Sequence, residues 1–194
     1  MFGIDTSHHN DVIDWKAVAK DPQGVSFAYL KATEGTGYID PKFYTNAQNA
    51  ANAGLKIGFY HFATLNTDNV VPDAKAEAAF FMASIAKAPK TELPLVLDIE
   101  TNKAGLDKEE VLVWINTFFA ELEKAGFKDP VLYSYTPFLN SNLPPKHGLG
   151  NRRLWLAAYV NKQVPLLPNG WKDYWLWQYT AKGTIPGIKT TVDL

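Results

Sequence analysis

The stretch LPLVLDIE, residues 93–100, is an apolar run that ends on two carboxylates, Asp98 and Glu100. Alternate side chains of an extended strand point to opposite faces, so the two acids share one face with Val96, and the leucines and isoleucine share the other. The step between the acids is about 6.6–6.8 Å. Like charges this close disfavour joint ionisation and raise one pKa, which gives the protonated and ionised carboxyls that glycosidic bond cleavage requires. A solvated strand end whose acids contact only water or a lysine explains the pair equally well.

Short apolar runs recur along the whole chain, separated by amphipathic stretches. They predict strands at FGID (2–5), VSFAYLK (25–31), LKIGFYHF (55–62), LPLVLDIE (93–100), PVLYSY (130–135), LWLAAY (154–159) and YWLWQY (174–179), with TTVDL (190–194) as a candidate eighth. The later connections are rich in Pro, Asn and Gly and predict mostly loops, at residues 140–150 and 161–170.

Three amphipathic stretches between these strands predict helices, at residues 41–54, 72–86 and 107–126. Asp40 and Pro41 supply an N-cap and a first-turn proline for the first helix. Asp107 and Glu110 form a capping-box-like start for the third.

The alternation of strands and helices predicts an α/β fold with mostly parallel strands. Seven or eight strands favour a barrel, although the 194 residues are fewer than the roughly 250 of a complete eight-fold barrel. We therefore expect an irregular, abbreviated (β/α)8-like barrel that forms a single domain over residues 1–194. A doubly wound open sheet is the alternative, but no Gly-rich phosphate loop follows the first strand.

The composition is that of an ordinary globular protein with a high aromatic content. Hydrophobic residues make up 46% and charged residues 20%, and the net charge of -1 gives no electrostatic reason to expect nucleic acid as a partner. The aromatic fraction of 13% includes six Trp and nine Tyr. Such residues often line sites for sugars, although a Trp-rich core explains them too.

Cysteine is absent, so neither a disulfide framework nor a thiolate metal site is expected. The start, MFGIDTSHHN, has neither the charged nor the apolar region of a secretory signal, and no apolar run is long enough to predict membrane insertion. These features suit a phage endolysin made in the host cytoplasm, and a secreted enzyme whose leader has been removed fits equally well. We expect a monomer.

Polar side chains stand at the carboxyl end of each predicted strand, which is the active-site face of an α/β barrel. They are Asp5, Lys31 with Glu34, Tyr60 with His61, Asp98 with Glu100, Tyr133 with Tyr135, Tyr159, Gln178 and Asp193. If the barrel closes, the last strand lies beside the first, which makes Asp193 a neighbour of Asp5.

The ordered segments FGIDTSHHN, YLKATEG, IGFYHF, LVLDIE, LYSY, LWLAAY, WQY and VDL resemble glycoside hydrolase family 25 over nearly the whole chain. These are the N-acetylmuramidases, or lysozymes, of the Chalaropsis and phage endolysin type. The resemblance implies a flattened, irregular α/β barrel and a peptidoglycan substrate, cut at the β-1,4 bond between N-acetylmuramic acid and N-acetylglucosamine. Many relatives also carry a separate wall-binding module, for which this chain has no segment.

The resemblance implies catalytic roles for Glu100, Asp98, Asp5 and Asp193. Glu100 matches the acid that protonates the leaving oxygen, and we expect burial and nearby Asp98 to raise its pKa. Asp98 would orient and stabilise the substrate's 2-acetamido group, with retention of configuration, because two carboxyls on one strand are close for an inverting pair, which needs roughly 6.5–9.5 Å. Asp5 and Asp193 would shape the field around the pair. The sequence leaves retention and inversion open.

Candidates for sugar contact are Tyr60, Tyr133, Tyr159, Trp177 and Gln178, of which Trp177 is the one most readily explained as core. Lys31 and Glu34 suit an ion pair at the rim as well as they suit substrate contact. No cofactor is expected, and the scattered His8, His9 and His61 lack the spacing of a zinc site.

Two rival functions stay open. A chitinase-like N-acetylglucosaminidase would carry further acids upstream on the same strand, where this chain has Pro94 and Val96. A non-catalytic barrel that binds cell-wall sugars would keep the groove without the chemistry. A wall amidase or peptidase is less favoured, because no metal or Cys-His constellation is present.

Overall fold

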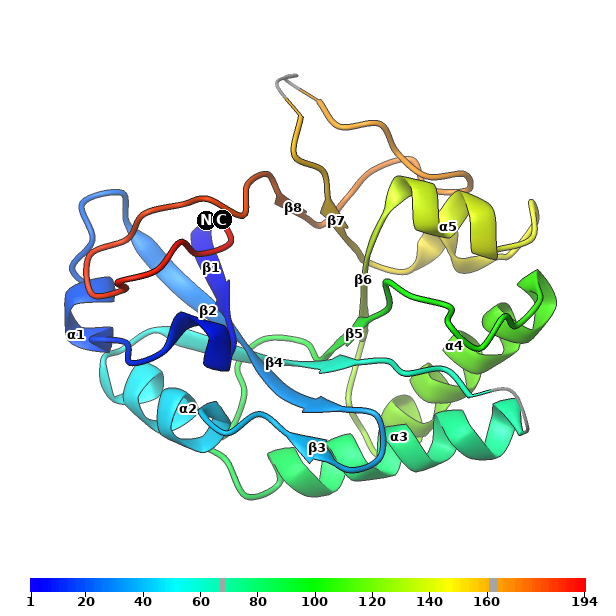
Figure 1. Cartoon of the computed structure of the whole chain (residues 1–194), viewed down its shortest axis with the longest axis horizontal. Coiled ribbons are helices and arrows are strands. Elements are labelled where there is room, and N and C mark those ends of the chain that lie inside the picture. Colours follow the sequence, from blue (N-terminus) through cyan, green and yellow to red (C-terminus); the bar gives the residue numbers. More distant parts are fainter. Residues whose placement is uncertain (67–68, 161–163) are drawn as a thin grey trace.

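The computed structural model describes residues 1–66, 69–160 and 164–194. An eight-stranded sheet curls into a half-barrel, with helices packed on its outer face (Figure 1). The strand order is β1-β2-β4-β5-β6-β7-β8; these neighbours pair in parallel, and β3 pairs antiparallel with β2. The strands are β1 Phe2–Thr6, β2 Val25–Glu34, β3 Tyr38–Ile39, β4 Lys56–Phe62, β5 Val96–Asp98, β6 Val131–Tyr135, β7 Leu154–Ala157 and β8 Leu176–Gln178. The predicted fold, an abbreviated barrel with mostly parallel strands, is confirmed.

The C-terminal segment fills the seam between β1 and β8. Asp193 forms an antiparallel bridge with Asp5 on β1, and the backbone of Leu194 bonds to Tyr179 and Thr180 just beyond β8. The predicted proximity of Asp5 and Asp193 is therefore confirmed, and the two ends of the chain meet in Figure 1.

The candidate eighth strand at residues 190–194 is not a strand: the segment makes only isolated antiparallel bridges, which do not extend the parallel sheet. A parallel neighbour needs a long crossover connection. Here the chain instead turns back on itself, with Gly183 and Val192 bonded to each other in both directions, and returns antiparallel.

The helices are α1 Trp15–Val18, α2 Phe43–Asn52, α3 Val70–Ile85, α4 Lys108–Lys124 and α5 Thr136–Asn142, with short 3₁₀ helices at His8–Asn10 and Leu149–Asn151. The three predicted helices correspond to α2, α3 and α4. The capping box of α4 is confirmed, because Glu110 N donates to Asp107 Oδ1 at 2.9 Å and Asp107 N donates to Glu110 Oε2 at 2.8 Å.

Asp40 is not the N-cap of α2, which begins two residues later than predicted, after Lys42. Its carboxylate accepts instead from the backbone N–H of Lys42 and from the backbone N–H of His8. The short α1 and α5 carry too few turns to show helical periodicity in the sequence, and α5 extends into the predicted 140–150 loop. The loop predicted at 161–170 lies partly outside the described residues.

The hydrophobic core has two parts, one on each face of the sheet. Leu95, Leu97 and Ile99 lie in the large outer core between the sheet and the helices. Val96 lies inside the half-barrel, in a smaller cluster with Phe27, Tyr29, Val131, Tyr133 and Trp155. The predicted alternation along residues 95–99 is confirmed, and the inner cluster forms the floor beneath the carboxyl ends of the strands.

Gly58 on β4 gives the Tyr29 ring its place in this inner cluster, because a Cβ at this position would overlap the ring. We expect Gly58→Ala to lower the free energy of unfolding by about 1–3 kcal/mol through overpacking. Chemical denaturation measures the change. Gly37→Ala is the matched control, because a Cβ there meets no atom within 4 Å and the backbone is not left-handed. Equal stabilities of the two variants would contradict this account of the packing.

Candidate active site

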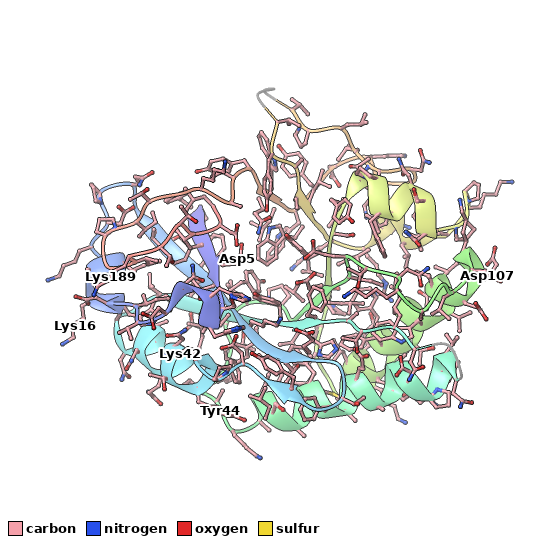
Figure 2. All side chains as sticks on the ribbon, in the orientation of Figure 1. Asp5, Lys16, Lys42, Tyr44, Asp107 and Lys189 are labelled. Atoms are coloured by element: carbon pink, nitrogen blue, oxygen red, sulfur yellow. The ribbon has the colours of Figure 1, made fainter. Side chains whose placement is uncertain are left out.

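A pocket of about 270 Å³ opens at the carboxyl ends of the strands, above the inner cluster. Most of the predicted site residues line it: Asp5, Lys31, Tyr60, Asp98, Glu100, Tyr133, Tyr159, Gln178 and Asp193. Asp5 lies on β1 and faces the centre of the half-barrel (Figure 2). The carboxyl ends of β1 and β5 therefore bring Asp5, Asp98 and Glu100 into one hollow, as the barrel prediction required, and the antiparallel C-terminal segment adds Asp193.

Burial raises the pKa of all four acids in the pocket. Asp5 and Asp98 are only 8% and 6% exposed, and their pKa values are raised well above the usual range. The pKa values of Glu100 and Asp193 are raised as well, again chiefly by burial. A pocket with these acids retains protons at a pH where exposed carboxyls have lost them.

Asp98 and Glu100 shift each other's pKa in opposite directions. The charge of Glu100 adds to burial in raising the pKa of Asp98. For Glu100, burial raises the pKa and the Asp193 charge adds to it, whereas the hydrogen bond with Asp98 and the Lys31 cation lower it. Burial thus acts on Glu100 as predicted, but the expectation that Asp98 raises its pKa is wrong. Both pKa values remain raised, so the two acids lose their protons as a coupled pair.

One oxygen of Asp98 is an unused acceptor. Oδ1 is buried and has no hydrogen-bond partner among the described residues. Buried polar atoms are nearly always paired, so an unpaired carboxylate oxygen in a pocket is a natural place for a ligand N–H or O–H.

Three polar side chains form a chain of hydrogen bonds that ends on Asp5. The hydroxyls of Tyr133 and Tyr159 both donate to Gln178 Oε1, at 2.8 and 2.6 Å. Gln178 Nε2 then donates to Asp5 Oδ2 at 2.8 Å. The residues come from β6, the segment after β7, β8 and β1, so the sheet order places them side by side.

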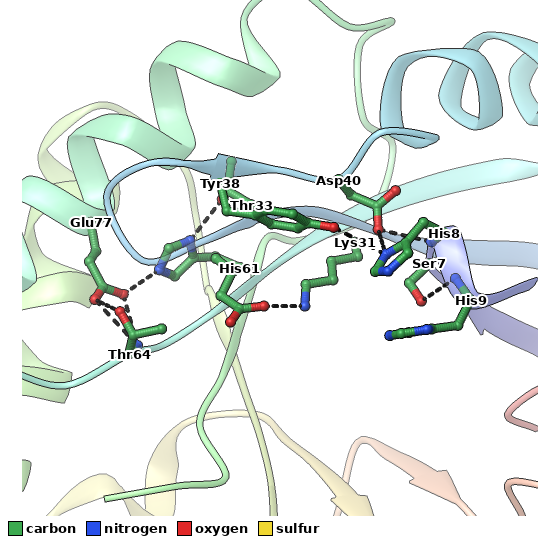
Figure 3. Close-up of polar contacts among 11 residues, drawn as sticks. Ser7, His8, His9, Lys31, Thr33, Tyr38, Asp40, His61, Thr64 and Glu77 are labelled. Atoms are coloured by element: carbon green, nitrogen blue, oxygen red, sulfur yellow. Dashed lines mark hydrogen bonds and ion pairs between the residues drawn. The ribbon is translucent and has the colours of Figure 1, made fainter. Parts of the chain in front are cut away.

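Lys31 is the cation of the pocket, and Figure 3 shows it at the centre of a row of polar contacts. Its Nζ lies 2.6 Å from Glu34 Oε2 and 4.9 Å from the centroid of the Phe62 ring. The ion pair suggested by the sequence is confirmed. Glu34 itself does not line the pocket.

Trp177 does not line the pocket either. It borders a separate hollow of about 210 Å³ at the β1–β8 seam, and its indole N–H donates to Ala158 O at 2.9 Å. Gln178, the next residue, faces the pocket, and adjacent residues of a strand point to opposite sides.

The histidines occupy different surroundings. His61 is fully buried between β4 and α3, with Nε2 2.7 Å from Glu77 Oε2 and Nδ1 2.8 Å from Thr33 Oγ1 (Figure 3). His61 is thus a hydrogen-bonded core residue, one of the two places the sequence suggested. His8 Nδ1 lies 2.8 Å from Asp40 Oδ2. Across the described ranges, no group of three or more His, Asp or Glu is arranged to hold a metal ion.

The pocket also contains residues that sequence reasoning did not single out as site residues: Ser7, His9, Phe62, Val96 and Trp155. Trp155 is the most informative of them, because it touches both the pocket and the inner cluster. Its signal in the sequence was the alternation of LWLAAY, which puts Trp155, Ala157 and Tyr159 on one face.

An α/β half-barrel that gathers a proton-sharing carboxyl pair at the carboxyl ends of its strands has the site of a glycoside hydrolase. Comparisons with known proteins specify the family. The family profile described as glycosyl hydrolases family 25 matches residues 4–188. The chain belongs to this family of glycoside hydrolases, as the sequence resemblance implied.

Similar proteins include lysozyme M1 of Streptomyces globisporus, which is 35% identical over 98% of this chain and 65% of its own length. The N,O-diacetylmuramidase of Chalaropsis sp is 26% identical over 98% of this chain and 95% of its own length. Among solved structures, the bacterial lysozyme from Streptomyces coelicolor has a TM-score of 0.87 and 36% identity, covering 98% of this chain and 88% of that one. The chain thus spans a little under two thirds of the Streptomyces globisporus enzyme.

In the parts of the chain that the structure describes, no helix is both long and apolar enough to cross a membrane.

Proposed function

We propose that this chain hydrolyses bacterial peptidoglycan at the β-1,4 bond between N-acetylmuramic acid and N-acetylglucosamine, with Glu100 as the general acid. The observation that carries the proposal is the pair formed by the buried Asp98 and the half-buried Glu100 at the active-site face of the half-barrel. Family membership and the names of similar proteins, lysozyme and N,O-diacetylmuramidase, support the substrate class. The site of action is then the bacterial cell wall.

Asp98 is proposed to bind the 2-acetamido group of the muramic acid residue. Its unpaired Oδ1 offers an acceptor for the acetamido N–H. A donor at this oxygen stabilises the ionised form of Asp98 and lowers its pKa, so the proton of the pair passes to Glu100. Substrate binding would therefore load the acid that the reaction needs.

Bond cleavage then follows a substrate-assisted route. The acetamido oxygen attacks the anomeric carbon as the bond to the leaving oxygen breaks, and Glu100 gives its proton to that oxygen. Glu100, now ionised, takes a proton from water, which attacks the same carbon and reopens the ring formed by the acetamido group. Each displacement inverts the anomeric carbon, so two displacements retain the β configuration.

The decisive experiment is digestion of purified peptidoglycan, followed by reduction with borohydride and mass spectrometry of the new ends. We expect reduced N-acetylmuramic acid. Reduced N-acetylglucosamine would place the cut at the other bond. Binding of the chain to peptidoglycan without any new reducing ends would make it a sugar-binding barrel.

The stereochemical route has its own readout. Proton NMR of the first-formed product should show the β anomer before mutarotation. Initial α product would contradict the retaining route and leave Asp98 as the base of an inverting reaction.

A further inference from the structure

Gln178 is a buried amide whose orientation is fixed by its neighbours. It is 3% exposed, and its carbonyl oxygen accepts from two phenol hydroxyls, those of Tyr133 and Tyr159. An ionised carboxylate accepts hydrogen bonds and donates none. Turning the amide over would place its oxygen against Asp5 Oδ2, where two acceptors repel each other. The arrangement with Nε2 toward Asp5 is therefore the one that satisfies the amide and the carboxylate together.

We propose that Gln178 is a positioning residue, locked by the hydroxyls of Tyr133 and Tyr159 so that its amide favours the ionised form of Asp5 and fixes the orientation of that carboxyl within the pocket. This inference rests on the proposed hydrolase function. The sequence suggested sugar contacts for these two tyrosines and for Gln178. In this proposal the tyrosine hydroxyls bind Gln178 instead, and the Gln178 amide binds Asp5. The tyrosine rings remain part of the pocket wall.

The charge of Asp5 needs this support because the surrounding groups oppose it. Asp193 in the C-terminal segment, Glu100 after β5 and Asp98 on β5 are acids in the same pocket, and the Tyr60 phenol from β4 also faces it. Burial, the Asp193 charge and a hydrogen bond with Asp193 all raise the pKa of Asp5. The hydrogen bond from the Gln178 amide lowers the pKa of Asp5, since a donor stabilises the ionised carboxylate.

An ionised Asp5 suits the proposed chemistry. Positive charge develops on the sugar as the glycosidic bond breaks, and a carboxylate fixed in a pocket with little water stabilises that charge without having to reorient. Asp5 would thus act on the reacting sugar, and Gln178 would act through Asp5.

The test is a carbon NMR titration of the Asp5 carboxyl, which requires no turnover. In the Tyr133→Phe/Tyr159→Phe double variant and in Gln178→Leu, we expect the Asp5 titration midpoint to rise by about one to two pH units, because a charge-assisted hydrogen bond is weakened or lost. Each single tyrosine variant should shift it much less, since one donor still holds the amide. Tyr44→Phe is the matched control: its hydroxyl donates to Ser84 O, away from Asp5 (Figure 2).

Kinetics on peptidoglycan give the second readout. The acidic limb of the kcat/KM profile, which reports the free enzyme, should move to higher pH by the same amount as the Asp5 midpoint, with kcat/KM lowered roughly 10–100-fold at acidic pH. An unchanged Asp5 titration midpoint in the folded double variant and in folded Gln178→Leu would overturn the positioning role of Gln178. So would a rise in KM with kcat and the acidic limb unchanged, which is the signature of lost sugar contacts. A wild-type chain that releases no reducing ends would refute the proposed function, while the NMR titration would still show whether Gln178 acts on Asp5.

Discussion

Glu100→Gln is expected to lower kcat on peptidoglycan by about 10²–10⁴-fold, the range for removal of a general acid. The amide keeps the size and the hydrogen-bonding shape of the carboxyl but has no proton to give to the leaving oxygen. KM should change little, because the substituted atom acts mainly in the transition state. Release of reducing ends from purified walls measures the effect.

Glu109→Gln is the matched control for this loss, because it is the same substitution at an exposed position on α4. We expect it to retain wild-type kcat. Wall lysis by Glu100→Gln at the wild-type rate would remove Glu100 as the acid and direct attention to the other carboxyls of the pocket.

Asp98→Asn is expected to lower kcat by about 10²–10³-fold, of the order seen when a group that stabilises developing charge is removed. The amide can no longer balance the positive charge that forms on the acetamido group. Small substrates that carry a very acidic leaving group need no proton from Glu100, and they should remain slow with Asp98→Asn while recovering with Glu100→Gln. Recovery of both variants on such a substrate would contradict separate roles for the two acids.

The same Asp98→Asn change should increase stability at neutral pH. The native pKa of Asp98 is raised above its value in the unfolded chain, chiefly by burial. The native state therefore binds the proton more tightly, and the stability contributed by this group is fully present below about pH 3.8 and is lost as the pH rises through the native pKa. An amide does not titrate. We expect the variant to gain about 1–3 kcal/mol in unfolding free energy at pH 7 and little at pH 4, measured by denaturant titration at both values.

If the variant were less stable than the wild type at pH 7, ionisation of the buried Asp98 carboxyl would not be what destabilises the native state. Asp107→Asn, which retains a capping side chain at an exposed helix start, provides a control with the same chemistry outside the pocket.

The features best predicted from the sequence are local ones, such as the alternation of side chains along a strand. The alternation of LPLVLDIE correctly divided Leu95, Leu97 and Ile99 from Val96, and it sent Asp98 and Glu100 to one space. The capping box at Asp107 was equally local and equally well predicted. Such features depend on neighbours a few residues away, so the linear sequence contains them.

The predictions of site residues that differ from the structure also have physical reasons. Trp177 and Gln178 were both assigned to sugar contact, although adjacent residues of one strand point to opposite faces, and only Gln178 lines the pocket. For Glu34 the sequence left an ion pair with Lys31 and substrate contact open, and the structure shows the ion pair, with Glu34 outside the pocket. The alternation of LWLAAY does contain the signal for Trp155, whereas the antiparallel return of Asp193 depends on how distant segments meet, which no local pattern encodes.

The bridge between Asp5 and Asp193 has a consequence for the timing of folding. Asp5 and Asp193 are almost 190 residues apart in the sequence. Contacts between such distant positions form late, because the entropy cost of closing a long loop comes before the contact can stabilise the fold. A chain emerging from the ribosome can pair β1 with β2 early, yet its pocket lacks a carboxyl until residue 193 arrives. We therefore expect hydrolytic activity to appear only in the last step of folding, after most of the sheet is already in place.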